Sequence, residues 1–595
     1  MAKSLINDYL KGIAPYKTSS HKVWMVDASG RGDILKLDWN EATIPPSPKV
    51  INRLKEWLEE PCFLNLYPAT TNFELLELLS QYTKVPMENI LYFASSDVVH
   101  EYIARVYLEP GKSVLIQAPA YDNFRLTAQS NGAKVRFSEV CADDFSFDKN
   151  KFENDIRNTN PDLVYICSPN NPIGYVTEKD YIEHLLQTFP NTMFLIDEAY
   201  IEFSKTPSVS AFVTKYENII VTRTMSKAFA CANLRFGYML SSIKNIQCIN
   251  SIRNPKNINT FTQNAIIAAL QDTEYMHNYV QTVDLAKKWF VDAVNKLARV
   301  RAYESDANFV LIKFDSYGVK AQMFKWLKDN DIFVREVSQS PILYKCLRIT
   351  IGTKPQMERV LDCMQKFYKH LPVKKSDKVA LFDFCDTMVD FQTGNAFTKY
   401  VISYSNIGFN RKFIYKMKHI WYRHILDKDF EKILLLECCR GIKKAEMEKL
   451  ALNYYVEIVR PRLIKATMDK LTFYQNNGYR IYIVSGGFDM YLKYFAEEFN
   501  IDGVFATHVQ FKGNVCTGRF DGIDCMCANK IKILKEYFET NKIDGVAFSD
   551  SVTDLPLLKF ATTGFAVGCD AGRLNWATQN DLETLIYTPK EYYMG

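Results

Sequence analysis

The chain has 595 residues, of which 47% are hydrophobic and 24% are charged, and its formal net charge is +5. These are values of a globular protein, and the length predicts more than one domain. The slight charge, without a long basic block, argues against a nucleic-acid partner, and no apolar run approaches the roughly 20 residues that span a bilayer. The amino terminus has no signal-peptide core, so we expect a cytoplasmic protein.

The 14 cysteines and eight histidines give no sign of a zinc site or a disulfide framework. The cysteines are scattered, and the close pairs at 438–439 and 525–527 lack partner pairs at zinc spacing. The histidines also lack metal-ligand spacing. We therefore expect free thiols in a reducing cytoplasm.

Two predicted strands in the first half of the chain end in polar side chains. The apolar run at 163–166 leads into a turn-rich segment that contains Asn171. The run at 194–196 ends at Asp197, with Tyr200 three residues later. An α/β sheet presents its chemistry at the carboxyl ends of its strands. Each junction could be an ordinary strand-to-loop transition, but their order along the chain argues for one shared site.

A lysine follows these strands in a setting that suits a covalently bound aldehyde. Lys227 stands beside Ser226, and Arg235 follows eight residues later. A buried lysine loses its proton readily and becomes a nucleophile, while hydroxyl and guanidinium groups can hold a phosphate. This combination indicates pyridoxal 5'-phosphate as the cofactor. A surface lysine in front of a helix is the alternative interpretation of this segment.

The residues at the strand ends fit the rest of that cofactor. Asp197 can hold the pyridinium nitrogen protonated, which keeps the ring an electron sink. Tyr200 and Asn171 can both bond the phenolic oxygen of the ring. The sequence therefore predicts that these three residues and Lys227 share one cofactor site.

Residues 30–365 resemble the fold-type I pyridoxal-phosphate aminotransferases, and within them the histidinol-phosphate aminotransferase-like group. The motifs that carry the resemblance are Leu37–Glu41, Tyr67–Pro68, Ala118–Tyr121, Ala307–Val310 and Leu347–Gly352. The resemblance implies an α/β fold with a large mixed-sheet domain and a small α/β domain. It also implies a homodimer with shared cofactor sites.

The same resemblance implies roles for single residues. Tyr121 would stack on the cofactor ring, and Ser226 and Arg235 would hold the cofactor phosphate. Tyr67 would reach the phosphate of the neighbouring subunit, and Arg348 would bind the carboxylate of the amino donor. The residues assigned to substrate binding are Asn40, Arg335 and Arg348.

The turn before residue 96 departs from the family pattern. The family usually has Asn-Gly-Ser/Ala-Asp there, whereas this chain has Ser95 in place of the glycine. The backbone N–H groups of Ser96 and Asp97, at the start of a helix, can still receive the cofactor phosphate. The departure predicts a backbone angle at Ser95 that would suit glycine better. A simple helix cap would use the same atoms.

The second half of the chain begins after a predicted linker. Residues 369–378 are polar, basic and interrupted by Pro372, which is typical of an exposed linker. They separate a first domain, residues 1–368, from a second domain, residues 379–595.

The second domain again has predicted strands that end in polar residues. The strands are expected at 379–382, 479–484 and 546–549, and the residues at their ends are Asp383, Ser485, Gly486 and Asp550. A carboxylate at a strand tip can attack phosphorus when a divalent cation and nearby donors cancel the charge repulsion. Lys530 opens an amphipathic run and could neutralise a phosphoryl group. Asp554 adds a hard oxygen ligand for Mg²⁺.

Residues 378 to about 590 resemble the phosphoserine phosphatase-like branch of the haloacid dehalogenase superfamily, most specifically at 485–488 and 550–558. The resemblance implies a Rossmann-like domain in which Asp383 is the nucleophile. Ser485, Gly486 and Lys530 would hold the phosphoryl group, and the stretch at about 391–473 would be a helical cap. The residues assigned to Mg²⁺ are Asp383, Cys385, Asp550 and Asp554.

Two departures bear on the activity of the second domain. Its relatives usually carry an acid/base aspartate two residues after the nucleophile, where this chain has Cys385. Loss of such a group costs about 10²–10⁴-fold in rate, unless Asp386 compensates in part. Gln392 stands where phosphoserine phosphatases carry a glutamate for the substrate ammonium, which argues against phosphoserine. A catalytically decayed, structural domain is the alternative.

The fusion of the two domains predicts an order of reactions. We expect transamination of a small phosphorylated ketone or keto acid by glutamate or another donor, followed by Mg²⁺-dependent removal of the phosphate. Candidate acceptors are imidazole acetol phosphate, phosphohydroxypyruvate and dihydroxyacetone phosphate, and a small carbonyl compound is favoured because nothing in the chain demands an imidazole. A pyridoxal-phosphate-dependent decarboxylase of a phosphorylated amino acid is the alternative within the same fold.

Overall fold

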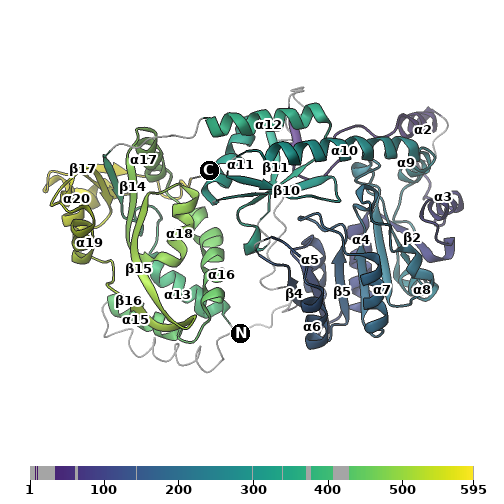
Figure 1. Cartoon of the computed structure of the whole chain (residues 1–595), viewed down its shortest axis with the longest axis horizontal. Coiled ribbons are helices and arrows are strands. Elements are labelled where there is room, and N and C mark those ends of the chain that lie inside the picture. Colours follow the sequence, from purple (N-terminus) through teal and green to yellow (C-terminus); the bar gives the residue numbers. More distant parts are fainter. Residues whose placement is uncertain are drawn as a thin grey trace. The chain divides into compact units, whose positions relative to one another are not determined.

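The computed structural model describes residues 7, 10, 34–59, 64–142, 144–297, 299–315, 317–337, 340–369, 377–405 and 428–593. The chain divides into two compact units (Figure 1). The first contains the described residues up to 369 except 317–325, and the second contains 317–325 and the described residues from 377 onward. Most of the predicted linker, residues 370–376, lies outside the described residues.

A seven-stranded mixed sheet forms the centre of the first unit, in the order β2-β8-β7-β6-β5-β3-β4. Its strands are β2 (Ile90–Phe93), β3 (Ser113–Ala118), β4 (Lys134–Glu139), β5 (Leu163–Cys167), β6 (Met193–Asp197), β7 (Ile219–Thr224) and β8 (Gly237–Ser241). The strands from β7 to β4 pair in parallel, whereas β8 runs antiparallel to both of its neighbours. The expected strands at 163–166 and 194–196 are confirmed as β5 and β6.

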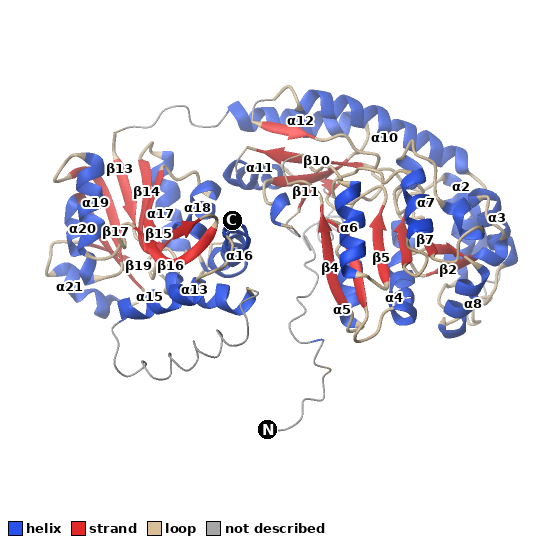
Figure 2. Cartoon of the chain, turned by 60° about the horizontal axis from the view of Figure 1, so that its bottom comes forward, coloured by secondary structure: helices blue, strands red, loops and turns tan. Residues whose placement is uncertain are grey.

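Helices flank this sheet (Figure 2). In chain order, the helices of this part of the chain are α2 (Pro48–Glu59), α3 (Phe73–Thr83), α4 (Ser96–Tyr107), α5 (Asn123–Ser130), α6 (Lys149–Thr159), α7 (Lys179–Thr188), α8 (Ile243–Ile252), α9 (Thr260–Leu270) and α10 (Thr273–Val294). Of these, α2 packs on α9, and α10 packs on the smaller sheet of this unit. Every residue of β5 and β7 is buried. Strands that are covered on both faces read as continuous apolar runs, which is why the sequence pattern located them.

A five-stranded sheet in the order β1-β11-β12-β10-β9 forms the smaller part of the first unit. The strands are β1 (Leu35–Leu37), β9 (Val300–Ala302), β10 (Phe309–Phe314), β11 (Ile332–Glu336) and β12 (Cys346–Thr350), followed by α12 (Lys354–Lys369), and α11 (Tyr317–Asp329) joins β10 to β11 in sequence. β1 pairs in parallel with β11. In the antiparallel pair of β11 and β12, Arg335 lies opposite Arg348. The sheet thus brings three distant segments of the chain to one place.

The second unit is built on another seven-stranded sheet, in the order β16-β15-β14-β13-β17-β18-β19. Its strands are β13 (Val379–Phe382), β14 (Arg480–Phe488), β15 (Gly503–Lys512), β16 (Val515–Asp521), β17 (Ile543–Ser549), β18 (Ala561–Gly568) and β19 (Glu583–Ile586). The central strand β13 pairs in parallel with β14 and β17. The three strands that the sequence predicts are therefore neighbours, and their carboxyl ends lie at one edge.

The helices of the second unit are α13 (Thr393–Tyr404), α15 (Lys428–Cys438), α16 (Lys444–Tyr454), α17 (Lys465–Asn476), α18 (Asp489–Glu498), α19 (Ala528–Phe538), α20 (Leu555–Phe560) and α21 (Asn575–Thr578). The described part of the segment predicted as a cap is helical, and its residues 406–427 lie outside the described residues. Both units have the mixed α/β architecture that the sequence predicts.

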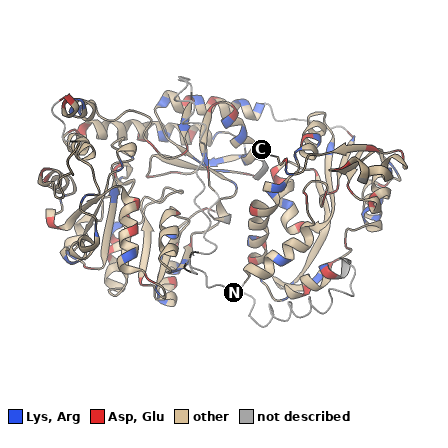
Figure 3. Ribbon diagram, turned by 180° about the vertical axis from the view of Figure 1, so that it is seen from behind, with Lys and Arg blue, Asp and Glu red and all other residues tan. Residues whose placement is uncertain are grey.

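Acidic and basic side chains are interspersed along the helices of both units, as Figure 3 shows. In the described part of the chain, no helix is both long enough and apolar enough to cross a membrane.

Candidate active sites

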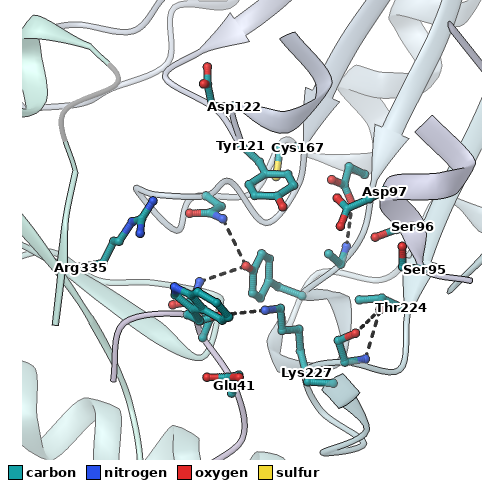
Figure 4. A pocket seen from close by; sticks show the side chains of 18 of the residues that line it. Glu41, Ser95, Ser96, Asp97, Tyr121, Asp122, Cys167, Thr224, Lys227 and Arg335 are labelled. Carbon is teal, nitrogen blue, oxygen red and sulfur yellow. Dashed lines mark hydrogen bonds between the residues drawn. The ribbon is translucent and has the colours of Figure 1, made fainter. Parts of the chain in front are cut away.

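A cavity of about 410 Å³ in the first unit lies at the carboxyl ends of β5, β6 and β7 (Figure 4). The predicted residues that line it are Asn40, Ser96, Asp97, Tyr121, Asn171, Asp197, Tyr200, Ser226, Lys227, Arg235, Arg335 and Arg348. Figure 4 shows Lys227 between two ends of the cavity, with Arg335 at one end and Ser96 and Thr224 at the other. Tyr67 does not line the cavity and is 80% exposed.

Lys227 presents a reactive amine to this cavity. Its Nζ donates to the carbonyl oxygen of Trp39 at 2.9 Å and lies 5.7 Å from the ring centre of Tyr200. Burial, and then the positive charge of Arg348, lower the pKa of Lys227 to about 8. A substantial fraction of the amine is therefore neutral near physiological pH, as a nucleophile toward an aldehyde must be.

The hydroxyl of Tyr200 is oriented by two amides. It accepts hydrogen bonds from Asn40 Nδ2 at 3.0 Å and from Asn171 Nδ2 at 3.2 Å. Both lone pairs of the hydroxyl are then occupied, and its proton is left to donate to an oxygen in the cavity. Asn171 also accepts from Arg348 Nη1 at 2.6 Å, and Arg348 Nη2 donates to the carbonyl oxygen of Asp38 at 2.6 Å. This guanidinium is thus held in place before a substrate arrives.

A carboxylate lies at the end of β6 and lines the cavity. Asp197 is 3% exposed, its Oδ2 accepts from the hydroxyl of Tyr165 at 2.8 Å, and its Oδ1 accepts from the backbone N–H of Ala199 at 3.2 Å. Burial raises the pKa of Asp197, while His100 and Tyr165 oppose the rise. A buried anion at this place suits a protonated ring nitrogen.

Hydroxyl and backbone donors converge at the other end of the cavity, where α4 begins. Thr224 Oγ1 donates to Ser226 Oγ at 2.9 Å, and Arg235 Nη2 lies 3.5 Å from Asp97 Oδ2. The backbone N–H groups of Ser96 and Asp97, at the start of α4, can also receive an anion. These donors form a cup that fits a phosphate. Thr224 was not among the predicted site residues, although its hydroxyl belongs to the same short segment as Lys227.

The backbone of this cup is strained and tightly packed. Ser95 has a φ of 102°, in the region that favours glycine, as its departure from the family pattern predicts. Its Oγ also accepts from the N–H of Val98 at 3.4 Å, so the helix-cap interpretation holds as well. A Cβ at Gly237 would lie 2.3 Å from the nitrogen of Ser96, which leaves room for glycine alone.

A second cluster of polar side chains lies at the carboxyl ends of β13 and β17 in the second unit. Lys530 Nζ, on α19, donates to Asp383 Oδ1 at 2.9 Å and to Asp554 Oδ2 at 2.6 Å. Burial alone would lower the pKa of Lys530, but the two carboxylates outweigh it and raise the pKa above its usual value. The ammonium is therefore fixed in its charged form beside Asp383.

Two carboxylates in this cluster carry charge that one lysine does not balance. Burial, and then the nearby carboxylates Asp383 and Asp386, raise the pKa of Asp550 to about 7. The pKa of Asp383 is raised to about 6, because burial and Asp554 outweigh Lys530. A divalent cation held by Asp383 and Asp550 would balance this charge, and their oxygens suit Mg²⁺.

Two other residues assigned to Mg²⁺ have different neighbours. Asp554 accepts from Lys530 and from Ser549 Oγ, the latter at 2.8 Å, and the thiol of Cys385 lies 3.0 Å from Thr393 Oγ1. Among the residues that the structure describes, no group of three or more His, Cys, Asp and Glu side chains is arranged to hold a metal. Asp554 is paired with Lys530 and a thiol is a poor Mg²⁺ ligand, so Asp383 and Asp550 suit Mg²⁺ better than the other two predicted residues.

The turn at the end of β14 presents a hydroxyl and glycine backbone near Asp383. Ser485 Oγ accepts from the N–H of Gly487 at 3.0 Å, which leaves its proton to donate to a phosphoryl oxygen. The thiol of Cys385 lies 3.9 Å from this hydroxyl. Burial raises the pKa of Cys385, so the thiol stays protonated.

Lys432 on α15 is a residue of this site that the sequence interpretation missed. It is 5% exposed, and its Nζ donates to the carbonyl oxygen of Gly486 at 2.5 Å, to Thr507 Oγ1 at 2.9 Å and to Asp524 Oδ1 at 2.6 Å. It thereby fixes the turn that carries Ser485. The sequence does contain a signal for it, because Lys432 lies on the same face of the helix as Leu435 and Leu436, which are buried.

The two sites have the residues of an amine-transferring cofactor enzyme and of a phosphate-ester hydrolase. In agreement, residues 32–363 match the family model described as aminotransferase class I and II, and residues 380–559 match that of the haloacid dehalogenase-like hydrolases. The chain belongs to the aminotransferase class I and II family and carries a haloacid dehalogenase-like hydrolase domain after it.

Relatives of known sequence match the aminotransferase part. The chain is 40% identical to the dihydroxyacetone phosphate transaminase Cj1437c of Campylobacter jejuni, over 61% of this chain and 97% of the relative. It is 33% identical to the histidinol-phosphate aminotransferase of Ruminiclostridium cellulolyticum, over 61% of this chain and 98% of the relative.

A solved structure shows the same fold. The histidinol-phosphate aminotransferase of Sinorhizobium meliloti, in complex with pyridoxal-5'-phosphate, is 22% identical and aligns with a TM-score of 0.56. The alignment covers 62% of this chain and 99% of that protein. The family and the fold agree with the residues that line the cavity.

Proposed function

We propose that this enzyme transfers an amino group to a small phosphorylated ketone and then hydrolyses the phosphate ester of the aminated product. The observation that carries the proposal is the presence, in one chain, of the Lys227 cavity and the Asp383 cluster. Two sites on one chain raise the effective concentration of the intermediate at the second site.

Dihydroxyacetone phosphate is the ketone that we favour. The support is the 40% identity to a protein named for that reaction, which extends over nearly the whole length of the relative. The product would be an aminated propanediol phosphate, and the hydrolase unit would release the free amino diol. Glutamate is the proposed amino donor, because Arg348 is positioned to bind a carboxylate.

In the first site, each side chain has a separate task. When bound, pyridoxal 5'-phosphate supplies an electron sink that stabilises negative charge on the substrate carbon next to nitrogen. The neutral amine of Lys227 takes the proton from that carbon and returns it at a different atom. Asp197 would hold the ring nitrogen protonated, and Tyr200 would donate to the phenolic oxygen.

In the second site, Asp383 would attack the phosphorus while the ester P–O bond breaks and the leaving oxygen takes up a proton. Water would then cleave the phosphoryl group from Asp383. Lys530 and the hydroxyl of Ser485 would neutralise the phosphoryl oxygens, and Asp383 and Asp550 would hold Mg²⁺. The protonated thiol of Cys385 is a weaker acid than the usual aspartate, so we expect slow hydrolysis.

A homodimer is proposed for the first unit. In its described residues 58–59 and 64–73, large apolar side chains are exposed, namely Leu58, Leu64, Leu66, Tyr67 and Phe73. Such a patch is typical of a protein–protein interface. Tyr67, 80% exposed and outside the cavity of its own subunit, would then be free to reach the cofactor of a second copy.

The test is a coupled assay on the purified full chain with pyridoxal 5'-phosphate, Mg²⁺, glutamate and dihydroxyacetone phosphate. We expect 2-oxoglutarate to form first and inorganic phosphate to follow after a lag. Asp383→Asn should abolish phosphate release from the aminated product and leave 2-oxoglutarate formation intact. If the unaltered protein forms 2-oxoglutarate but releases no phosphate, the second unit is structural. Carbon dioxide release from a phosphorylated amino acid, without a ketone, would identify a decarboxylase instead.

A further inference from the structure

Two buried polar side chains lie beside Asp197 but outside the cavity. His100 on α4 and Tyr165 on β5 are both 0% exposed, and neither lines the cavity. Polar groups in such a position destabilise a fold unless they find partners. Their surroundings are otherwise apolar: Phe124 stacks on Tyr165 with ring centres 4.7 Å apart and meets His100 edge-on at 5.4 Å.

Both side chains converge on one oxygen of Asp197. The hydroxyl of Tyr165 donates to Oδ2 at 2.8 Å, and His100 Nε2 lies 3.9 Å from the same atom. His100 Nε2 is also 3.3 Å from Thr222 Oγ1, on the neighbouring strand β7. The other oxygen, Oδ1, accepts from the backbone N–H of Ala199.

The position of the imidazole proton follows from its neighbours. In the described part of the chain, Nδ1 of His100 is buried and has no hydrogen-bond partner. A neutral imidazole carries its proton on the nitrogen that has an acceptor, and an imidazolium carries one on both, so Nε2, which faces oxygen atoms, is protonated in either form. The N–H of His100 is therefore directed toward Asp197 and Thr222.

These donors act against the effect of burial. Removing a carboxylate from water favours its neutral form, and burial does raise the pKa of Asp197. The carboxylate of Asp97 adds to the rise, whereas His100, Tyr165 and the N–H of Ala199 oppose it. A neutral Asp197 could not hold a ring nitrogen in its protonated form.

We infer that His100 and Tyr165 are positioning residues, which clamp Asp197 from behind so that it stays ionised and points toward the ring nitrogen of the cofactor. The inference rests on the pyridoxal-phosphate site of the proposed function. It differs from a purely structural role because both polar groups meet on Asp197, a carboxylate that lines the cavity.

The experiment uses the full chain loaded with pyridoxal 5'-phosphate. Tyr165→Phe removes one oxygen atom, and His100→Leu removes the ring N–H in an apolar setting. His100→Gln keeps a donor near the place of Nε2. Tyr107→Phe is the matched control, because it removes another hydroxyl, bonded to Asn245 Oδ1 at 2.9 Å, from the same helix as His100.

Two properties are measured in each variant: the dissociation constant of the cofactor, and the pH at which its visible absorption changes. We expect Tyr165→Phe to weaken cofactor binding about tenfold, the size expected for a lost hydrogen bond to a charged group. His100→Leu should weaken it by a smaller factor, because Nε2 of His100 lies 3.9 Å from Asp197 Oδ2. The absorption midpoint should move to higher pH, because a ring that loses its positive charge no longer opposes protonation at the nitrogen of Lys227. His100→Gln should restore most of both properties.

The clamp is overturned if Tyr165→Phe and His100→Leu match the unaltered protein in both properties, or change no more than Tyr107→Phe does. Should His100→Leu fail to fold, Tyr165→Phe and His100→Gln decide the question. An unaltered protein that binds no pyridoxal 5'-phosphate would contradict the proposed function instead, so the two failures are distinguishable.

Discussion

Each unit of this protein places a lysine at the carboxyl ends of parallel strands, Lys227 in the first and Lys530 in the second, and the two lysines have opposite electrostatics. Lys227 has a positive neighbour in Arg348, and burial brings its pKa down to about 8. Lys530 lies between Asp383 and Asp554, and its pKa is raised despite burial. The first lysine can react as a neutral amine, whereas the second remains a fixed positive charge.

The comparison teaches that burial alone does not decide what a lysine can do. Desolvation favours the neutral form in both units, and the charge of the nearest partners then determines the outcome. In the first unit, a cationic neighbour lowers the pKa further and leaves the lysine able to react as a neutral amine. In the second unit, two carboxylates raise the pKa and keep the lysine positively charged.

The largest effect should come from removing the reactive group of each unit in turn. Lys227→Ala should abolish 2-oxoglutarate formation, because proton transfer alone contributes about 10²–10⁴-fold. It should leave hydrolysis of the aminated phosphate ester unchanged, and Asp383→Asn should show the reverse pattern. Both activities are measured on the full chain with separate substrates. A variant that lost both activities would contradict two independent sites.

Lys530→Met should destabilise the protein, since it leaves Asp383 and Asp554 buried without their cation. Breaking a buried ion pair costs about 3–5 kcal/mol. The pKa of Asp383 is already raised to about 6, so lowering the pH below that value protonates it and should reduce the loss. Urea unfolding at pH 8 and pH 5.5 measures the difference. Lys535→Met, an exposed position on the same helix α19, is the control and should change stability little.

Cys385→Asp should accelerate phosphate release. The substitution places a carboxylic acid where the thiol now keeps its proton, and an acid/base group at a leaving oxygen contributes about 10²-fold or more. The measurement is the rate of phosphate release from the aminated ester with Mg²⁺ present. An unchanged rate would show that another group, such as Asp386, already serves as the acid.

The reactivity of Lys227 should depend on pH with a midpoint near 8. Below its pKa of about 8 the amine is protonated, so the rate at which cofactor-free protein takes up pyridoxal 5'-phosphate should rise about tenfold per pH unit. Above pH 8 this contribution should level off. Stopped-flow absorbance measures the rate, and a rise that continued to pH 10 would indicate an unperturbed lysine.

Ser95→Gly should stabilise the first unit slightly. The φ of 102° at Ser95 is strained for a side chain, and relieving it is worth about 1 kcal/mol, whereas replacing a serine cap by glycine costs only a few tenths. Thermal unfolding of the variant measures the net change in stability. Ser242→Gly is the matched control, because Ser242 caps α8 at a φ of −59° and should only lose stability.

Much of both sites could be predicted because their residues follow apolar runs. Asp197 and Asp383 end buried strands, and parallel pairing brings such ends to one edge. Lys227 could be predicted because hydroxyl and guanidinium groups lie close to it in sequence. The family motifs predicted the remaining site residues, including Arg335 and Arg348. The strands that carry these two arginines pair in the structure.

The residues that escaped prediction lie inside helices and strands. His100 and Lys432 interrupt apolar helical stripes, and Tyr165 belongs to a fully buried strand. A sequence pattern gives no partner for such a side chain, because the partner comes from a distant segment: Lys432 meets Asp524, 92 positions away. Tertiary packing determines which partner a buried polar side chain contacts, so these partners are known only from the structure.

The amide of Asn171 links two polar groups of the first site. Its nitrogen donates to Tyr200 and its oxygen accepts from Arg348, so one side chain joins the two residues that we propose for the cofactor and for the substrate carboxylate. A carboxylate that binds Arg348 competes with the amide oxygen for the same guanidinium. Under the proposed function, a change in the bond between Arg348 and Asn171 would then reach the hydroxyl of Tyr200 through the same amide.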